Sequence, residues 1–201
     1  MRPLLATTVA VLLLALGVPL EGSPAEFVPL GQLPGATSAT AAAISADGST
    51  VVGSSGSEAF LWTREGGIVG LGMLPGTSSC SARGVSADGS VVVGSCSGPS
   101  GHQAFRWTAA AGMVSLGGLP GGSSSGTIAS AVSADDSVIV GSAGRALGNE
   151  AVLWTNDGGI VELGDLAGGD FCSSAVGVSA DGSTVVGQGT SALSKIGRAH
   201  V

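Results

Sequence analysis

The feature that most constrains this chain is an internal repeat. The segment Ile44–Gly53 reads Ile-Ser-Ala-Asp-Gly-Ser-Thr-Val-Val-Gly. Close copies of it follow at Val85–Gly94, Val132–Gly141 and Val178–Gly187. A motif of ten residues that occurs four times, at intervals of 41, 47 and 46 residues, indicates an array of similar structural units rather than one irregular domain.

Two further motifs recur in the same order. Glu58–Thr63 reads Glu-Ala-Phe-Leu-Trp-Thr and returns at Gln103–Thr108 and Glu150–Thr155. A segment containing Leu-Gly-x-Leu-Pro-Gly or a close variant spans Phe27–Gly35, Ile68–Gly76, Met113–Gly121 and Ile160–Gly168. The unit is therefore compound, and its parts keep a fixed order along the chain.

Each unit divides into four short strands, which we name a to d. Strand a leads into Ser-Ala-Asp-Gly and strand b is the Val-rich run that follows. Strand c carries the Ala-Phe-x-Trp-Thr motif, and strand d follows a Gly-rich turn such as Glu65–Gly67. Asp-Gly between two such runs is typical of a β-hairpin, because Gly adopts positive φ without a Cβ clash. We predict an all-β chain.

Four strands in about 46 residues match one blade of a β-propeller. The expected order opens on an isolated strand d at Phe27–Leu30, continues a-b-c-d three times, and ends on a-b. Propellers commonly close by completing one blade with strands from both ends of the ring. We therefore predict an incomplete β-propeller. A β-solenoid is the alternative, although tight Asp-Gly hairpins do not wind a coil.

Composition excludes two classes of protein. There are 7 Lys and Arg residues against 14 Asp and Glu, so the chain has no basic surface for a phosphate backbone, and we expect no nucleic-acid partner. Hydrophobic residues make up 44% of the chain, which is too apolar for a solvated disordered protein.

The two ends of the chain differ from the repeats. Residues 1–25, with Arg2 followed by an apolar run from Leu4 to about Leu20, are typical of a signal peptide, and an uncleaved anchor is the alternative. We expect no other membrane span.

We assign 26–190 to the repeat domain and 191–201 to a non-repeat tail. From Ile196 the tail resembles the in-frame translation of a sequencing adapter, so the chain is expected to be a fragment.

Over the repeat domain the chain resembles the HAF-type extracellular repeat family of bacteria. That family carries a His-Ala-Phe triplet before Trp-Thr, after a Val-Ser-Ala-Asp-Gly-Ser-Val-Val-Val-Gly run. Here the triplets read Glu58-Ala59-Phe60, Gln103-Ala104-Phe105 and Glu150-Ala151-Val152, so the His is absent, with His102 one residue early. The resemblance implies a secreted or surface-displayed protein, sometimes with a C-terminal sorting or translocation module, and no established catalytic activity.

The repeated turn residues have two interpretations. Their carboxylates could bind calcium or act in catalysis, but each copy offers a single Asp, and calcium prefers six to eight oxygen ligands. Asp-Gly is favoured in such turns on backbone grounds alone. We therefore predict a structural turn role and no metal site for Asp47, Gly48, Asp88, Gly89, Asp135, Asp181 and Gly182.

The recurring aromatic residues also have two interpretations. Alternation along strand c places each Trp on the same face as the residue two before it. Such a pair could form a platform for sugars, but it supplies most of the bulky apolar area in its unit. We predict that the repeat core between blades contains Phe60, Trp62, Phe105, Trp107 and Trp154.

No catalytic constellation is evident. His200 lies in the tail, His102 stands alone in an expected loop, and no Glu recurs in every copy. We predict a non-enzymatic exported scaffold, without cofactor, that binds an unknown extracellular glycan or protein. Two alternatives stay open: a propeller domain of an extracellular polysaccharide hydrolase or lyase, and the passenger of a surface autotransporter. Because terminal repeats leave apolar faces uncovered, residues 26–195 alone are expected to aggregate or oligomerise.

The three cysteines allow one geometric prediction. A type I turn at Ser86–Ser90 with Gly89 in the bulge position would pair Ser86 with Ser90. Counting outward from that pair places Cys80 directly opposite Cys96, within reach of a structural disulfide. Cys172 falls opposite Thr190 in its own copy, so its state stays open.

Overall fold

The computed structural model describes residues 27–122, 126–157, 159–166, 172–190 and 196–200. The regular elements in these segments are all β-strands. They are β1 (Ala39–Ile44), β2 (Thr50–Ser55), β3 (Glu58–Thr63), β4 (Gly67–Gly70), β5 (Ser79–Val85), β6 (Val91–Gly98), β7 (Gly101–Thr108), β8 (Gly112–Ser115), β9 (Thr127–Val132), β10 (Val138–Arg145), β11 (Gly148–Thr155), β12 (Ile160–Gly164), β13 (Ser173–Val178), β14 (Thr184–Gly189) and β15 (Ile196–His200).

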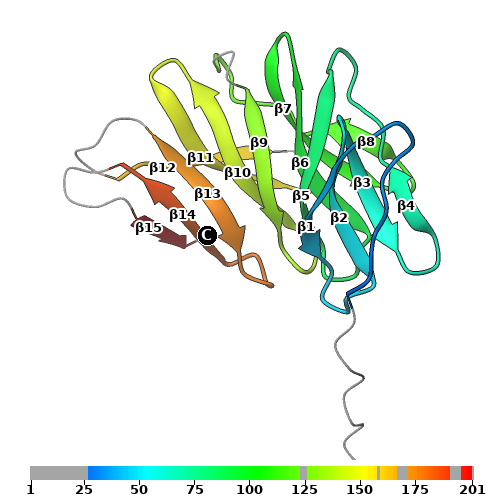
Figure 1. Cartoon of the computed structure of the whole chain (residues 1–201). Coiled ribbons are helices and arrows are strands. Elements are labelled where there is room, and N and C mark those ends of the chain that lie inside the picture. The colour runs from blue at the N-terminus through cyan, green and yellow to red at the C-terminus, as the bar shows by residue number, and fades with distance from the viewer. Residues whose placement is uncertain (1–26, 123–125, 158, 167–171, 191–195, 201) are drawn as a thin grey trace, which may run out of the picture.

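The strands form four separate antiparallel sheets, each containing consecutive strands. The first three are β1–β4, β5–β8 and β9–β12, and the fourth contains β13–β15. We call them the first to fourth blades. Figure 1 shows the sheets arranged as a fan, with blade following blade around an arc. The predicted all-β fold with four-stranded units is confirmed, and the arrangement is that of a β-propeller rather than a coiled solenoid.

Each blade packs face to face on the next, and the core lies between the blades. Strand alternation directs one set of side chains toward the preceding blade and the other set toward the following blade. Val52 of the first blade thus packs with Val92 and Phe105 of the second, and Val93 of the second with Ile139 and Trp154 of the third. The third interface contains Val140, Leu153, Ala175 and Val185.

The Ser-x-Asp turns are stabilised by the same hydrogen bonds in all four blades. In the second blade, the Ser86 hydroxyl donates to Oδ1 of Asp88 at 2.7 Å, and the same oxygen accepts the Ser90 N–H at 2.9 Å. Ser86 Oγ also accepts the Val91 N–H at 3.0 Å. The equivalent aspartates are Asp47, Asp135 and Asp181. The motif is therefore a self-contained turn that satisfies its own backbone donors.

These hydrogen bonds change the acidity of the turn carboxylates. Donation from Ser45, and then from the backbone of Ser49, lowers the pKa of Asp47 from 3.8 to about 2. The hydroxyl of Ser179 acts in the same way on Asp181, whose pKa is also about 2. The pKa values of Asp88 and Asp135 are lowered by the equivalent serines. The turn network therefore favours the ionised carboxylate.

The fourth residue of the turn adopts the left-handed conformation, as the motif predicts. Gly48, Gly89 and Gly182 have φ values of 73°, 76° and 72°. Asp136 replaces the glycine in the third blade and has a φ of 63°, as the single non-glycine residue with positive φ among those described. Aspartate tolerates this region better than most residues, but at a cost that glycine does not incur.

The predicted pairing of Cys80 with Cys96 is confirmed, but the turn register used to derive it is wrong. Ser86 pairs with Val91 rather than with Ser90, because its N–H donates to the Val91 carbonyl at 2.9 Å. A β-bulge between Ala82 and Gly84 then shifts the register by one residue. Beyond the bulge Cys80 lies opposite Cys96, and the two form a disulfide bond.

The bulge recurs in all four blades and explains the glycine that ends the Val-Val-Gly motif. In the second blade, a Cβ added to Gly94 would lie 2.1 Å from the Ser81 carbonyl oxygen and 2.9 Å from the ring of Phe105. Equivalent backbone contacts occur at Gly53, Gly141 and Gly187. The strand must therefore lack a side chain at the position where the bulged neighbour approaches most closely.

The isolated strand expected at Phe27–Leu30 is not present. Residues 27–38 form no strand, although the Leu33 N–H donates to Ser55 Oγ at 3.0 Å and ties this segment to the first blade. A strand d pairs with a strand c in every complete blade. The described residues provide no such partner next to Phe27, so its backbone has no ladder to join.

The predicted tail and leader have different outcomes. Residues 196–200 of the tail form β15, which pairs with β14 and places Ala199 opposite Val185, where the other blades have their Trp. Backbone pairing thus continues the blade although the sequence no longer follows the repeat. The predicted signal peptide, residues 1–25, lies outside the described residues. In the described part of the chain, no helix is long and apolar enough to cross a membrane.

Candidate functional site

The two ends of the blades differ in how strictly they repeat. One end carries the Ser-x-Asp turns, which use the same hydrogen bonds in all four blades. The opposite end carries the β2–β3, β6–β7 and β10–β11 hairpins and the long connections between blades. The hairpin loops here read Gly56-Ser57, Pro99-Ser100 and Ala146-Leu147. Side chains that vary on a constant scaffold are the usual setting of binding residues.

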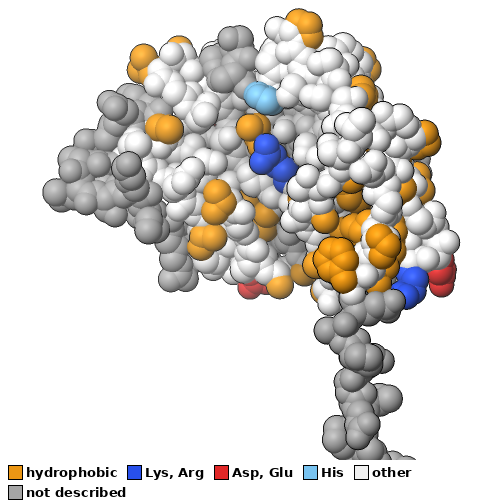
Figure 2. All heavy atoms as spheres, viewed as in Figure 1, with side chains coloured by type: hydrophobic (Ala, Val, Ile, Leu, Met, Phe, Trp, Pro, Cys, Tyr) orange, Lys and Arg blue, Asp and Glu red, His pale blue; other side chains and the backbone are white. Residues whose placement is uncertain are grey.

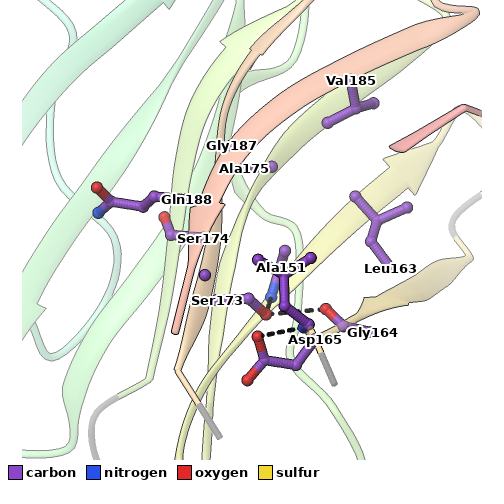
Figure 3. A pocket seen from close by; sticks show the side chains of 12 residues that line it. Ala151, Leu163, Gly164, Asp165, Ser173, Ser174, Ala175, Val185, Gly187 and Gln188 are labelled. Atoms are coloured by element: carbon purple, nitrogen blue, oxygen red, sulfur yellow. Dashed lines mark hydrogen bonds between the residues drawn. The ribbon is translucent and has the colours of Figure 1, made fainter. Parts of the chain in front are cut away.

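Three cavities lie at this variable end. The first and third lie between the third and fourth blades, and the second is lined mainly by the third blade. The first has a volume of about 240 Å³ and lies between β11 and β12 on one side and β13 and β14 on the other. Figure 3 shows Leu163 and Val185 on its apolar wall, with Asp165 and Gln188 at its polar edge. Ser173 lies at its base, where its hydroxyl accepts the Ala151 N–H and donates to the Gly164 carbonyl, both at 2.9 Å.

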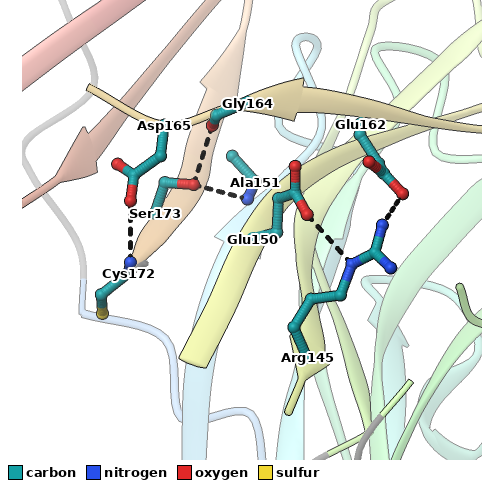
Figure 4. A network of polar contacts seen from close by, with 8 residues as sticks. All are labelled: Arg145, Glu150, Ala151, Glu162, Gly164, Asp165, Cys172 and Ser173. Atoms are coloured by element: carbon teal, nitrogen blue, oxygen red, sulfur yellow. Dashed lines mark hydrogen bonds and ion pairs between the residues drawn. The ribbon is translucent and has the colours of Figure 1, made fainter. Parts of the chain in front are cut away.

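The second cavity, of about 450 Å³, is bordered by a charged network. Arg145, at the end of β10, donates from Nε to Glu150 at 3.1 Å and from Nη2 to Glu162. Figure 4 shows the guanidinium held between these two carboxylates, which come from β11 and β12. Two carboxylates share one cation, so the cluster has a formal negative charge. Its partial exposure gives the ion pairs little weight in stability.

An apolar side chain lies beside this network. Leu147, in the β10–β11 hairpin, is 76% exposed and lines the second cavity together with Ala146. An exposed leucine next to fixed carboxylates combines apolar contact area with hydrogen-bond acceptors. This combination is typical of binding sites, in which a few placed polar groups orient a ligand on an apolar surface.

Asp165 links the connection after β12 to the start of β13. Its Oδ1 accepts the Leu166 N–H at 2.7 Å, and its Oδ2 accepts the Cys172 N–H at 2.8 Å. The third cavity, of about 380 Å³, lies next to this link and is lined by Asn149, Cys172 and Gln188, among others. Cys172 is an exposed free thiol whose carbonyl accepts the Thr190 N–H, so it lies beside Thr190 as the sequence predicted.

The arrangement can bind a ligand by hydrogen bonding and apolar contact. Among the described residues, no three His, Cys, Asp or Glu side chains gather closely enough to hold a metal ion. Ser173 is the hydroxyl at the base of the first cavity, and both of its hydrogen bonds go to backbone groups. This serine therefore positions the blades rather than serving as an activated nucleophile.

The structure places the sequence-predicted residues away from these cavities. The turn aspartates lie at the opposite end of the blades, and Cys80 and Cys96 lie between the first and second blades. Phe60, Phe105 and Trp154 are buried. Trp107 is partly buried against the first interface, whereas Trp62 lies half-buried on the outer face of the first blade.

The cavity residues Arg145, Leu147, Glu162 and Asp165 were missed by the sequence analysis. One signal could have indicated the first two. The third unit has Arg-Ala-Leu-Gly in its hairpin, where the first has Ser-Gly-Ser-Glu and the second Gly-Pro-Ser-Gly. Leu147 is the one bulky apolar residue among the two-residue loops of these three hairpins, and it marks the third hairpin as different.

Comparison with known proteins identifies the fold. No family model matches the chain, and no curated protein matches it. Among solved structures it is similar to a protein described as TolB from Agrobacterium tumefaciens, with a TM-score of 0.60 and 16% identity over 81% of this chain and 57% of that one. It is also similar to TolB from Acinetobacter baumannii, with a TM-score of 0.58 and 13% identity over 82% of this chain and 41% of that one.

A third similarity is more distant. A structure from a study of two prolyl endopeptidases gives a TM-score of 0.51 and 12% identity over 75% of this chain and 24% of that one. The chain spans about half the length of the TolB structures that it matches. At these identities the similarities show a shared architecture and no shared activity. The chain has the fold of a β-propeller built from four-stranded blades.

Proposed function

We propose that this chain is an exported, non-enzymatic scaffold of the HAF-type repeat class. Its variable end, between the third and fourth blades, binds an extracellular glycan or protein. The observation that carries the proposal is the contrast between the two ends of the blades. The turn end repeats the same polar network four times, whereas the cavities, the Arg145 network and the exposed Leu147 lie together at the other end.

Export is supported by two independent features. Disulfide bonds persist in oxidising compartments and are rare in the cytosol, and Cys80 and Cys96 form one in the core between the first two blades. The apolar run that begins at Leu4 after Arg2 is typical of a signal peptide. Together they favour a protein that folds outside the cytoplasm.

The experiment that tests the binding proposal uses the chain exported to the periplasm, with its disulfide formed. The protein is screened against a glycan array and against isolated bacterial envelope fractions. Leu147→Ser removes the exposed apolar side chain and is expected to weaken binding of the retained ligand by about tenfold, the effect of losing one well-buried contact. Val69→Ser is the matched control, because it removes an exposed valine from the outer strand of the first blade.

The outcomes are distinct. Retention on one class of glycan or envelope component, weakened by Leu147→Ser and unchanged by Val69→Ser, supports the proposal. Retention nowhere contradicts it. Turnover of a polysaccharide that is abolished by a single substitution, such as Glu162→Gln, would show instead that the domain is an enzyme.

A further inference from the structure

Three of the four Ser-x-Asp turns contain a dipeptide that is chemically reactive in a flexible chain. Asp47, Asp88 and Asp181 are each followed by glycine. Glycine has no side chain to shield its backbone nitrogen, so that nitrogen can attack Cγ of the preceding aspartate. The turn requires glycine at this place because the residue adopts positive φ. The residue that the backbone needs is therefore also the residue that makes the turn reactive.

The reaction converts aspartate into isoaspartate in two balanced steps. In the first step, the glycine nitrogen loses its proton and bonds to Cγ of the aspartate, the bond from Cγ to its hydroxyl breaks, and water leaves as a succinimide ring closes. In the second step, water adds to the main-chain carbonyl of the ring, and the bond between that carbonyl carbon and the glycine nitrogen breaks. The main chain then runs through Cβ and Cγ and is longer by one carbon, which would disrupt the turn.

Burial does not protect these turns from the reaction. All three aspartates are exposed. Figure 2 shows acidic side chains at the lower surface of the molecule, which is the end at which the β13–β14 turn lies in Figure 1. Water therefore has access to the turns, and any protection must come from contacts that hold the two reacting groups.

One serine holds both reacting groups in each turn. In the second blade, the Ser86 hydroxyl donates to Oδ1 of Asp88 at 2.7 Å, and the Ser86 carbonyl accepts the Gly89 N–H at 3.1 Å. The first contact stabilises the carboxylate, whereas water leaves readily only from the protonated acid. The second contact keeps the proton on the nitrogen that must lose it. Ser86 is itself fully buried, which fixes both contacts in place.

The same two contacts recur at the other Asp-Gly turns. In the first blade, the Ser45 hydroxyl donates to Asp47 at 2.6 Å and its carbonyl accepts the Gly48 N–H at 3.0 Å. Ser179 makes the equivalent contacts in the fourth blade, at 2.6 Å and 3.0 Å. Donation from the Ser45 hydroxyl also lowers the pKa of Asp47 to about 2, which reduces the fraction of the reactive protonated acid at neutral pH.

We propose that Asp47, Asp88 and Asp181 are sites of isoaspartate formation, and that the repeated serine of the motif protects them while the chain is folded. The serine thus has a chemical role besides the shape of the turn, because it prolongs the lifetime of a fold that requires Asp-Gly at an exposed place. In the third blade Asp136 replaces the glycine, and its side chain hinders attack by its own nitrogen. The inference does not depend on the proposed ligand-binding role.

The test uses two matched substitutions that each remove one serine hydroxyl. Ser86→Ala removes the donor to Asp88, and Ser45→Ala removes the donor to Asp47. The turn of Asp181 is unchanged in both variants and serves as the control within each chain. A variant that unfolds as a whole would expose all three sites at once, so the pattern of modification separates a local effect from general unfolding.

The exported full chain is incubated at neutral pH, and isoaspartate at each turn is quantified by electron-transfer dissociation of its peptides. The wild type in denaturing urea gives the rates of the unfolded chain, and the folded wild type is expected to be slower at all three Asp-Gly sites. Ser86→Ala should speed the reaction about tenfold at Asp88 alone, as expected for the loss of a hydrogen bond to a charged group. Ser45→Ala should do the same at Asp47 alone.

Three results would overturn the proposal. Equal rates in the folded and the unfolded wild type would show that the turns are not protected. An unchanged rate at Asp88 in Ser86→Ala would show that the serine hydroxyl does not control the reaction. Equal acceleration at all three sites in both variants would show that unfolding of the whole chain, rather than the local contact, sets the rate.

Discussion

Cys80 of the second blade occupies the position that Thr127 holds in the third. Each lies in the first strand of its blade. Their partners on the second strand, Cys96 and Ala143, each follow the glycine of the Val-Val-Gly or Val-Ile-Val-Gly motif by two residues. The Thr127 hydroxyl accepts the N–H of Ala104 in the preceding blade at 2.9 Å, and Ser173 does the same for Ala151. In the second blade a disulfide thus stands where the third and fourth blades have a hydrogen bond to the preceding blade.

This equivalence predicts different costs for two ways of removing the disulfide. Losing the cross-link should cost about 3 kcal/mol, as expected for a loop of roughly 15 residues. Cys80→Ser with Cys96→Ala restores a hydroxyl where Thr127 and Ser173 have theirs, so it should be about 1 kcal/mol more stable than Cys80→Ala with Cys96→Ala. Urea unfolding of both double variants measures the difference, and equal stabilities would contradict the assigned equivalence.

The turn aspartates predict a dependence of stability on pH. The pKa of Asp47 and of Asp181 is lowered from 3.8 to about 2 in the folded chain, by serine donors that the unfolded chain does not hold in place. A lowered pKa stabilises the fold above the unfolded value of about 4, and this stabilisation is lost as pH falls toward 2. Thermal unfolding followed from pH 6 to pH 2 should show the loss in that window.

A matched variant separates this effect from general acid denaturation. Asp181→Asn keeps an oxygen that can accept the Ser179 and Ser183 hydrogen bonds but removes the titrating carboxylate. The variant should be less stable than the wild type at pH 6, and the difference should shrink as pH falls toward 2. A difference that stays constant across this range would show that the Asp181 charge contributes nothing.

The motif glycine predicts a large effect from the smallest side chain. A Cβ at Gly94 would lie 2.1 Å from the Ser81 carbonyl oxygen, so the bulged strand would have to move. Gly94→Ala should destabilise the fold by about 3 kcal/mol, within the range of overpacked core substitutions. Gly159→Ala is the control, because its nearest neighbour would lie at 3.5 Å. Urea midpoints that fall equally for both variants would contradict the close approach.

The turn of the third blade predicts a stabilising substitution. Asp136 adopts a φ of 63°, and its Oδ1 is buried without a hydrogen-bond partner among the described residues. Asp136→Gly should raise the free energy of unfolding by about 1 kcal/mol, because glycine adopts this conformation without strain. The reciprocal Gly48→Asp should lower the free energy of unfolding, because Gly48 has a φ of 73°. Steric contact is not the cause, since a Cβ there would meet only Ile44, at 3.9 Å. Opposite signs for the two variants in thermal unfolding are the expected result.

The sequence predicted the strands and turns well, because glycine, aspartate and the alternating apolar residues mark each of them directly. The bulge could not be predicted from its own residues, since the bulged positions are Ala42, Arg83, Ser130 and Val176 and share no property. Its signature lies on the partner strand, in the repeated glycine. The predicted turn register was wrong by one residue, and the unpredicted bulge shifts the register by one residue in the compensating direction, so the cysteine pairing was nevertheless correct.

The cavities could not be predicted because they depend on how two blades diverge. Ala151, Leu163, Ser173 and Gln188 come from four different strands and meet at one end of the third interface. Repeat motifs report what every blade shares, whereas a binding site is formed where the blades differ. The β10–β11 hairpin, which carries Arg145 and Leu147, differs in sequence from the equivalent hairpins of the first two blades. That difference is the part of the site that the sequence shows.

Export and disulfide formation of the propeller can be measured together in one experiment. The full chain is expressed with its own N-terminus, recovered from the periplasm, alkylated without reduction and mapped by peptide mass spectrometry. We predict a product that begins after Ala25, a peptide pair linked through Cys80 and Cys96, and an alkylated Cys172. A chain retained in the cytoplasm with residues 1–25 intact, or a Cys80 peptide linked to Cys172, would contradict this prediction.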